Sequence, residues 1–436
     1  MDFLRNIIFG SLILIFTLAV GAQGSWEMLE VPTQNHLRSV YFTDSLYGWV
    51  VGDTGTILHT IDGGDSWMVQ DAGTQNPVMF VFFLDRLHGW AASWSLEGSF
   101  GTLLLKTTDG GNTWTQQLYP EENIFINVIL FRDLLHGWMG GSPHALVNTI
   151  DGGQTWKQAA IDTTAIAFFP VLDIAFWDEH YGYACGGMFD IAGVTWSTSD
   201  GGAYWTPIAN SEAPADEVHG LYLFDSLNVL GAGGDPDQGY GVGMLRTVDG
   251  GTHWEYEELS MAGNAFDIDF RNELEAWAPL GPQQKLIYSL DAGTTWTPVD
   301  SPEGSAIFDM IFPDSLHGYA VGYYGAFLRY IPPPVGISEK KDFPLPEIKI
   351  YPNPTDDVVM IEWTGRGGDL ETWRPGEIEI YNLHFEVLDS WLFETKSIEE
   401  NKIQLDLSVL DAGVYIVRIV FNDRNTSVVI HKLLIR

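Results

Sequence analysis

A short motif, Ser/Thr-x-Asp-x-Gly-x-x-Trp, recurs six times in this chain at a regular spacing in the forties. Recurrence at such a period indicates one supersecondary unit that is used repeatedly, as in a propeller or a linear array. The motif therefore constrains the architecture before any chemistry is considered. Its aspartates are Asp62, Asp109, Asp151, Asp200, Asp249 and Asp291.

A second motif precedes these turns: an apolar stretch that ends in Phe-x-Asp and is followed by Gly and an aromatic residue. It occurs seven times, with degenerate copies at Leu223 and Phe270. The seventh copy stops at Pro332 without an Asp turn, whereas Trp26 resembles the end of a turn that lacks its beginning. We therefore predict seven blades, with the N-terminal strand completing the last blade, because ring closure removes exposed sheet edges.

Each repeat predicts four strands rich in Val, Ile, Phe, Tyr and Trp, a composition that suits sheets covered on both faces by neighbouring blades. In the first repeat these strands are 38–42, 48–51, 56–60 and 67–70. The predicted fold class is all-β, a seven-bladed β-propeller followed by a small C-terminal β-sandwich. The predicted parts are a signal peptide (1–22), the propeller (23–331), a linker (332–347) and the sandwich (348–436).

The Asp turn resembles the Asp box of bacterial neuraminidase repeats. In such a turn the short Asp side chain accepts hydrogen bonds from nearby amides, Gly supplies unusual dihedral angles, and Trp packs between sheets. We interpret the six aspartates as structural, because equivalent positions on a ring are held apart and do not converge on one metal ion. The sequence predicts no metal site, no cofactor and no catalytic residue.

The whole blade pattern, Phe-x-Asp-x-x-x-Gly-Trp and then Thr-x-Asp-Gly-Gly-x-x-Trp, resembles the photosystem II stability and assembly factor family from Trp26 to Tyr330. The resemblance implies a seven-bladed binding scaffold without a known catalytic centre. A sialidase would instead need several arginines that converge on one carboxylate, and the propeller arginines fall in separate repeats.

Two sets of residues are candidates for ligand binding. Three second-to-third-strand loops are enlarged, at 91–101, 186–193 and 231–243, and variable loops on a rigid scaffold often carry recognition. Their aromatic candidates are Trp94, Phe100, Phe189 and Tyr240. Polar candidates at the starts of first strands, expected to rim the channel, are His36, Arg38, Asn127, Glu217 and His219. The alternative is that these aromatics hold their loops down and that the polar residues hydrogen bond at a solvated channel mouth.

Charge and the N-terminus predict where the protein acts. The net charge of −37 disfavours nucleic-acid binding, which needs clustered Lys and Arg. An apolar run from Ile7 to Val20 follows Arg5, and small residues precede Gln23, as in a secretory signal peptide. We predict no transmembrane segment in the mature chain.

The C-terminal region begins at Ile348 and contains Tyr351-Pro352-Asn353-Pro354 and Leu410-Asp411-Ala412-Gly413-Val414-Tyr415. These motifs and a terminal Lys-containing strand resemble the type A C-terminal sorting domain of type IX secretion substrates. The resemblance implies that the type IX machinery is a partner and that the protein is secreted or attached to the outer membrane or cell surface.

Two functional hypotheses follow. The first is a secreted or surface-displayed, non-enzymatic propeller that binds a protein or glycan. The alternative is an Asp-box-propeller glycoside hydrolase acting on extracellular glycans, which would need two carboxyl groups at a fixed separation.

Overall fold

The computed structural model describes residues 23–95, 100–162, 169–188, 191–209, 217–234, 241–333 and eight short segments between 347 and 435. The chain divides into two compact units, Met1–Val335 and Gly336–Arg436. Every long element in the described residues is a β-strand, and three short 3-10 turns complete the set. The all-β prediction is therefore confirmed.

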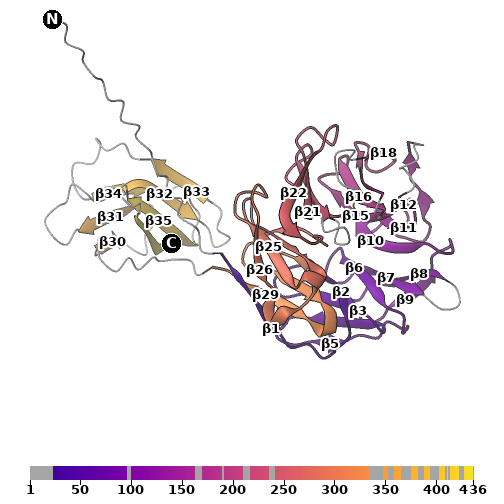
Figure 1. Ribbon diagram of the computed structural model, residues 1–436. Helices are drawn as coiled ribbons and strands as arrows, with labels where there is room; N and C mark the ends of the chain where they lie inside the picture. The colour runs from indigo at the N-terminus through magenta and orange to yellow at the C-terminus, as the bar shows by residue number, and fades with distance from the viewer. Residues whose placement is uncertain are drawn as a thin grey trace, which may run out of the picture. The chain divides into compact units, whose positions relative to one another are not determined.

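The first unit is a ring of seven antiparallel blades (Figure 1). Blade 1 has β2 (Leu37–Phe42), β3 (Gly48–Gly52), β4 (Thr56–Thr60) and β5 (Met68–Val69). Blade 2 has β6 (Val78–Phe83), β7 (Gly89–Ser95), β8 (Gly101–Thr107) and β9 (Thr115–Leu118). Blade 3 has β10 (Phe125–Phe131), β11 (Gly137–Ser142), β12 (Ala145–Thr149) and β13 (Lys157–Gln158). Blade 4 has β15 (Val171–Phe176), β16 (Gly182–Met188), β17 (Ala192–Thr198) and β18 (Tyr204–Ala209), with β14 (Ala160–Ile161) added in parallel to β18.

Blades 5 to 7 continue the ring. Blade 5 has β19 (Val218–Leu223), β20 (Val229–Gly234), β21 (Gly241–Thr247) and β22 (Glu255–Ala262). Blade 6 has β23 (Asp269–Phe270), β24 (Ala276–Pro279), β25 (Lys285–Ser289) and β26 (Thr297–Asp300). Blade 7 has β27 (Ile307–Ile311), β28 (Tyr319–Gly322), β29 (Phe327–Ile331) and β1 (Ser25–Leu29). The 3-10 turns are η2 (Gly281–Gln283), η3 (Pro302–Gly304) and η4 (Tyr323–Gly325).

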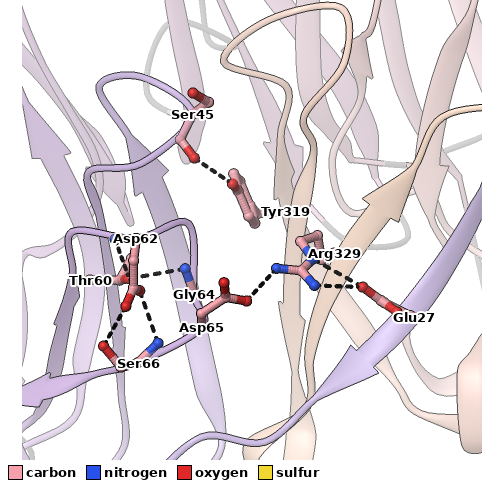
Figure 2. A network of polar contacts seen from close by, with 9 residues as sticks. All are labelled: Glu27, Ser45, Thr60, Asp62, Gly64, Asp65, Ser66, Tyr319 and Arg329. Carbon is pink, nitrogen blue, oxygen red and sulfur yellow. Dashed lines mark hydrogen bonds and ion pairs between the residues drawn. The ribbon is translucent and has the colours of Figure 1, made fainter.

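The predicted closure is confirmed, because β1 pairs antiparallel with β29 and places Trp26 opposite Tyr330. Trp26 packs edge-on against Trp277, Phe312 and Tyr330, with ring centroids 5.3–5.8 Å apart. Arg329 on β29 joins this strand to its neighbours. Its guanidinium contacts Glu27 on β1 at 2.9 Å and Asp65 in the Asp turn of blade 1 at 2.6 Å (Figure 2).

The second motif makes the contact between blades. At four of the seven junctions the aromatic residue of one blade packs against the Phe of the next, stacked in three pairs and tilted in the fourth, with ring centroids 3.5–4.3 Å apart. The pairs are Trp49–Phe83, Trp90–Phe131, Trp138–Phe176 and Tyr319–Phe42. The preceding Gly is required because a Cβ at Gly89 would lie 2.5 Å from the Phe83 ring of its own blade. The motif is therefore a packing device that repeats around the ring.

The enlarged loops are shorter than the sequence predicts. Strands β7, β16 and β20 continue into them, and pairs such as Ser95 with Gly101 and Met188 with Ala192 extend the ladders. The prediction of loops beginning at 91, 186 and 231 was therefore wrong, because cross-strand pairing persists beyond the motif.

The second unit contains two antiparallel sheets, and the prediction of a small C-terminal β-sandwich is confirmed. One sheet has the order β30 (Glu347–Tyr351), β31 (Val358–Thr364) and β34 (Lys402–Asp406). The other has the order β33 (Val387–Leu392), β32 (Pro375–Tyr381), β35 (Gly413–Phe421) and β36 (Ser427–Ile435).

Candidate functional site

The two faces of the ring differ in their turns. Because adjacent strands are antiparallel, the first-to-second and third-to-fourth turns lie on one face, and all remaining loops lie on the other. We call these the Asp-box face and the variable face.

The Asp boxes share one hydrogen-bond arrangement. In blade 1 the Thr60 hydroxyl donates to Asp62 (2.8 Å) and accepts from the Gly64 amide (2.9 Å), while the Ser66 amide donates to Asp62 (2.9 Å) (Figure 2). The bond from the Ser/Thr hydroxyl to Asp is 2.8–3.0 Å in all six turns. Each carboxylate accepts hydrogen bonds from its own turn, and in five of the six turns both carboxylate oxygens do so, which favours the structural interpretation.

The propeller arginines are also engaged locally. Arg86 pairs with Asp44, Arg271 with Glu275 and Arg329 with Glu27 and Asp65. Arg132 and Arg246 donate to main-chain carbonyls of the following blade. With Arg38 in blade 1, the six arginines fall in six blades, so they do not converge on one substrate carboxylate.

Arg38 and His36 lie together on the variable face. Arg38 forms a bidentate pair with Asp53 (2.8 and 3.1 Å), and its guanidinium lies 5.4 Å from the centre of the Tyr323 ring. Burial opposes the charge, but the bond to Asp53 raises the pKa of Arg38 above its usual value. His36 stacks on Tyr323 at 4.2 Å, and its Nδ1 accepts from the Tyr324 amide (3.0 Å).

Glu217 and His219 form a second polar pair, with His219 Nε2 3.2 Å from Glu217 Oε2. The side chains are only 18% and 17% exposed respectively, so the pair is largely closed to solvent. We call the first strand of each blade its inner strand. His219 and Arg38 each fall at a β-bulge of an inner strand, β19 and β2 respectively, where the register skips one residue. A bulge re-aims the side chain it carries, which brings these residues to the rim.

A continuous series of rings connects the two polar groups. Ring centroids are 5.3 Å apart between His219 and Phe266, 4.9 Å between Phe266 and Phe308, and 4.4 Å between Phe308 and Tyr323. Tyr323 then stacks on His36. We call these five residues the rim arc. It spans blades 5, 6, 7 and 1, and all five side chains are partly exposed.

The remaining candidates lie elsewhere. Asn127 donates to Ser142 Oγ (3.0 Å) and to the Val171 carbonyl (2.9 Å), bridging blades 3 and 4. Trp94 donates from Nε1 to the Ile126 carbonyl (2.8 Å), and Phe100 is exposed. Phe189 and Tyr240 lie outside the described residues. The structure thus brings His36 and Arg38 together and Glu217 and His219 together.

Sequence reasoning missed Phe266, Phe308, Tyr323 and Tyr324. Aligning the repeats offers a signal for two of them, since Tyr323-Tyr324-Gly325 occupies the turn filled by Asp53-Thr54-Gly55 in blade 1. The two phenylalanines carry no such signal, because they read as ordinary apolar strand residues.

Sequence reasoning also did not single out four aspartates that lie in or next to inner strands. Each accepts a main-chain N–H from the inner strand of the next blade: Asp309 from Val40, Asp173 from Leu221, Asp267 from Met310 and Asp269 from Phe312 (2.7–3.0 Å). The inner strand is a sheet edge, and these carboxyl groups satisfy donors that lack a strand partner.

Burial shifts these four groups toward the neutral form. It raises the pKa of Asp173 to about 6 and of Asp269 to about 7, against the hydrogen bonds that they accept. Burial also raises the pKa values of Asp267 and Asp309, and the charge of Asp309 adds to the rise at Asp267. Although the four residues keep part of their surface open, the surrounding protein sets the direction of the shift.

A groove of about 590 Å³ opens on the variable face where blades 6, 7 and 1 meet. Its walls include η3, η4 and the segment that follows β1. Tyr323 belongs to both the rim arc and this groove, so the two features adjoin.

Comparison with known proteins finds a match in each of the two units. A family model of the photosynthesis system II assembly factor YCF48 matches residues 18–120, and one of the secretion system C-terminal sorting domain matches residues 349–436. The first part of the propeller is thus similar to YCF48, and the second unit is similar to the secretion sorting domain. The tail supports type IX export and a secreted or cell-surface location.

Individual relatives extend this result. A photosystem II assembly protein Ycf48 from Synechococcus sp. is 49% identical over 41 residues, which is 9% of this chain and 12% of the relative. The solved structure "YCF48 bound to D1 peptide" has a TM-score of 0.55 at 21% identity, covering 71% of this chain and 99% of that one. A GH74 xyloglucanase from Xanthomonas campestris has a TM-score of 0.55 at 13% identity, covering 78% and 59%. At these identities the solved structures show a shared fold only.

Two kinds of feature are absent from the described residues. Within the ranges given above, no three or more His, Cys, Asp or Glu side chains are grouped so that they could hold a metal ion. No helix in the same part of the chain has the length and apolarity needed to cross a membrane.

Proposed function

We propose that this protein is an exported, non-enzymatic binding module whose YCF48-like propeller recognises a protein or glycan on its variable face. The observation that carries the proposal is the rim arc with its adjoining groove. It places partly exposed rings and polar groups beside an open groove, a combination typical of ligand sites.

The Asp-box face supports this assignment by contrast. There the carboxylates, hydroxyls and amides are occupied by one another. A ligand would have to displace those bonds, whereas the variable face also exposes Tyr324, Glu30 and Glu303.

A peptide or protein ligand is favoured by analogy with the solved YCF48 that is bound to a peptide. The glycoside hydrolase alternative draws on a fold shared with a xyloglucanase. The carboxyl groups of Asp267 and Asp309 interact directly with each other, whereas glycosidases separate their pair by roughly 5 Å or more.

The test screens the exported full-length chain on peptide and glycan arrays and with a panel of glycoside hydrolase substrates. We expect binding that is lost when His36 and Tyr323 are both replaced by Ala, and no turnover. The matched control replaces Leu135 and Leu316, exposed on the opposite face, by Ala. Turnover that a single carboxylate substitution abolishes would overturn the proposal, as would binding that only the control variant removes.

A further inference from the structure

The groove at blades 6, 7 and 1 combines exposed aromatic, acidic and apolar surface. Tyr324 is 73% exposed at its mouth, and Glu30 and Glu303 are also exposed. Met28, Val31, Ala306 and Ala326 contribute apolar surface, while Gln34, Gln284 and Ser305 contribute polar groups. No lysine, arginine or histidine is among the described residues that line it.

The backbone around the groove adopts an unfavourable conformation at three positions. Gln284, Glu303 and Tyr324 have φ values of 57°, 54° and 60°, and they are three of the six non-glycine residues with positive φ among the residues described. The left-handed region costs an L-residue about 1–2 kcal/mol. Such positions gather at ligand-binding surfaces when the side chain is needed for another purpose.

Tyr324 illustrates this conflict most clearly. Tyr324 and Gly325 both have positive φ, and the Ala326 amide bonds to the Tyr323 carbonyl, which defines a type I′ turn. The first central position of this turn favours Asn, Asp or Gly. The tyrosine there is strained, and its ring is mostly exposed apart from an edge contact with His36 at 4.7 Å, so packing accounts for only a small part of its surface.

The charges define which ligand fits. Two cations beside the groove are already neutralised, Arg38 by Asp53 and Lys285 by Asp300. Glu30 and Glu303 therefore face the groove as acceptors without a lining cation, in a chain of net charge −37. A lysine or arginine side chain satisfies all of these features, because its aliphatic stem packs on apolar surface while its charge lies over a tyrosine ring.

We propose that this groove binds an extended, basic peptide segment by inserting a Lys or Arg side chain between Tyr324 and the carboxylates of Glu30 and Glu303. The inference rests on the proposed binding function and names its ligand class. A neutral glycan is the competing occupant, since tyrosine rings also stack on sugars.

The test uses the exported full-length chain and the fluorescently labelled peptide Gly-Lys-Gly-Arg-Gly, with Gly-Glu-Gly-Glu-Gly as its acidic counterpart. Fluorescence anisotropy should show binding of the basic peptide alone, and its affinity should fall as salt screens the exposed carboxylates. Tyr324→Asn should weaken binding about tenfold through loss of the ring. This variant suits the type I′ turn, so it should fold at least as well as the parent.

Charge is tested separately with the double variant Glu30→Gln and Glu303→Gln, which should also weaken binding. The matched control, Glu273→Gln, removes an exposed carboxylate on the opposite face and should leave the affinity unchanged.

Equal affinity of the parent and Tyr324→Asn for the basic peptide, or no binding of that peptide, would overturn the groove assignment. So would a xyloglucan oligosaccharide whose binding Tyr324→Asn abolishes while peptide binding persists. If a ligand found on the arrays binds every groove variant as well as the parent, this inference is wrong, whereas the binding-module proposal still holds.

Discussion

At the scale of single residues, the repeats differ at positions where their shared geometry allows little freedom. Five Asp boxes place Gly directly after the aspartate, with φ of 72–76°, whereas the sixth has Ala292 at φ 58°. A Cβ at the equivalent Gly152 would lie 2.6 Å from the Leu134 carbonyl oxygen. Blade 6 therefore accepts a strain that the other five boxes avoid.

Relief of this strain is measurable. Ala292→Gly should raise the free energy of unfolding by about 0.5–1 kcal/mol, because glycine adopts positive φ without steric cost. The reverse change, Gly152→Ala, should lower it by more than about 1 kcal/mol. Chemical denaturation of both variants tests the pair, and a loss of stability in Ala292→Gly would contradict the explanation.

At the scale of elements, the ring depends on β1, which arrives from the other end of the propeller sequence. Trp26 on this strand is 9% exposed and contacts three aromatic rings of blades 6 and 7. Arg329 adds ion pairs that tie β1 and blade 1 to β29. The closing strand is thus held by both packing and charge.

Loss of the Trp26 side chain should weaken this closure. Trp26→Ala is expected to lower the free energy of unfolding by about 3 kcal/mol, the usual range for a buried tryptophan. Trp177→Ala, which removes a side chain that is 49% exposed, should change it by less than about 0.5 kcal/mol. Similar effects of the two variants would argue against a structural role for the closing strand.

At the scale of the whole molecule, two populations of carboxyl groups respond oppositely to pH. Asp269 and Asp173 have raised pKa values of about 7 and about 6, whereas hydrogen bonds from Thr155 and from the His253 amide hold Asp151 and Asp249 at about 2. The inner groups are protonated near pH 5, and the outer ones remain charged. The formal net charge of −37, which counts Asp173 and Asp269 as ionised, therefore overstates the negative charge on the inner strands at this pH.

The sign of the pH effect follows from linkage. Folded Asp269 binds its proton more tightly than the unfolded chain, in which the pKa is about 3.9, so its contribution is fully present below about pH 4 and is lost as pH rises through about 7. Asp151 and Asp249 contribute above about pH 4 and lose their contribution as pH falls toward about 2. Thermal unfolding should therefore show highest stability near pH 4–5. Asp269→Asn should flatten the decline between pH 4 and 7, whereas Glu273→Gln should not.

The second unit makes a separate prediction about location. If it directs export, a chain that ends before Ile348 should accumulate in the periplasm, because the element read by the type IX machinery is missing. Cell fractionation and surface protease accessibility, compared with the full-length chain, measure this. Normal display of the truncated protein would refute the sorting role.

The sequence alone determined the number of blades, the pairing of the N-terminal strand with the last blade and the C-terminal sorting domain. Each depends on short-range spacing, such as Asp62 to Trp67 or Phe83 to Trp90, which repeats along the chain. Local hydrogen bonds and side-chain size decide such features, so they are visible without the tertiary structure.

Only the tertiary structure decided what lies on the variable face. The groove assembles Glu30, Gln284, Glu303 and Tyr324 from distant parts of the chain, and the rim arc crosses four blades. These positions share no motif, and they meet because closure brings the first strand beside the last. A binding site on this surface depends on ring closure bringing these residues together, and ring closure is a property of the whole propeller and not of any single repeat.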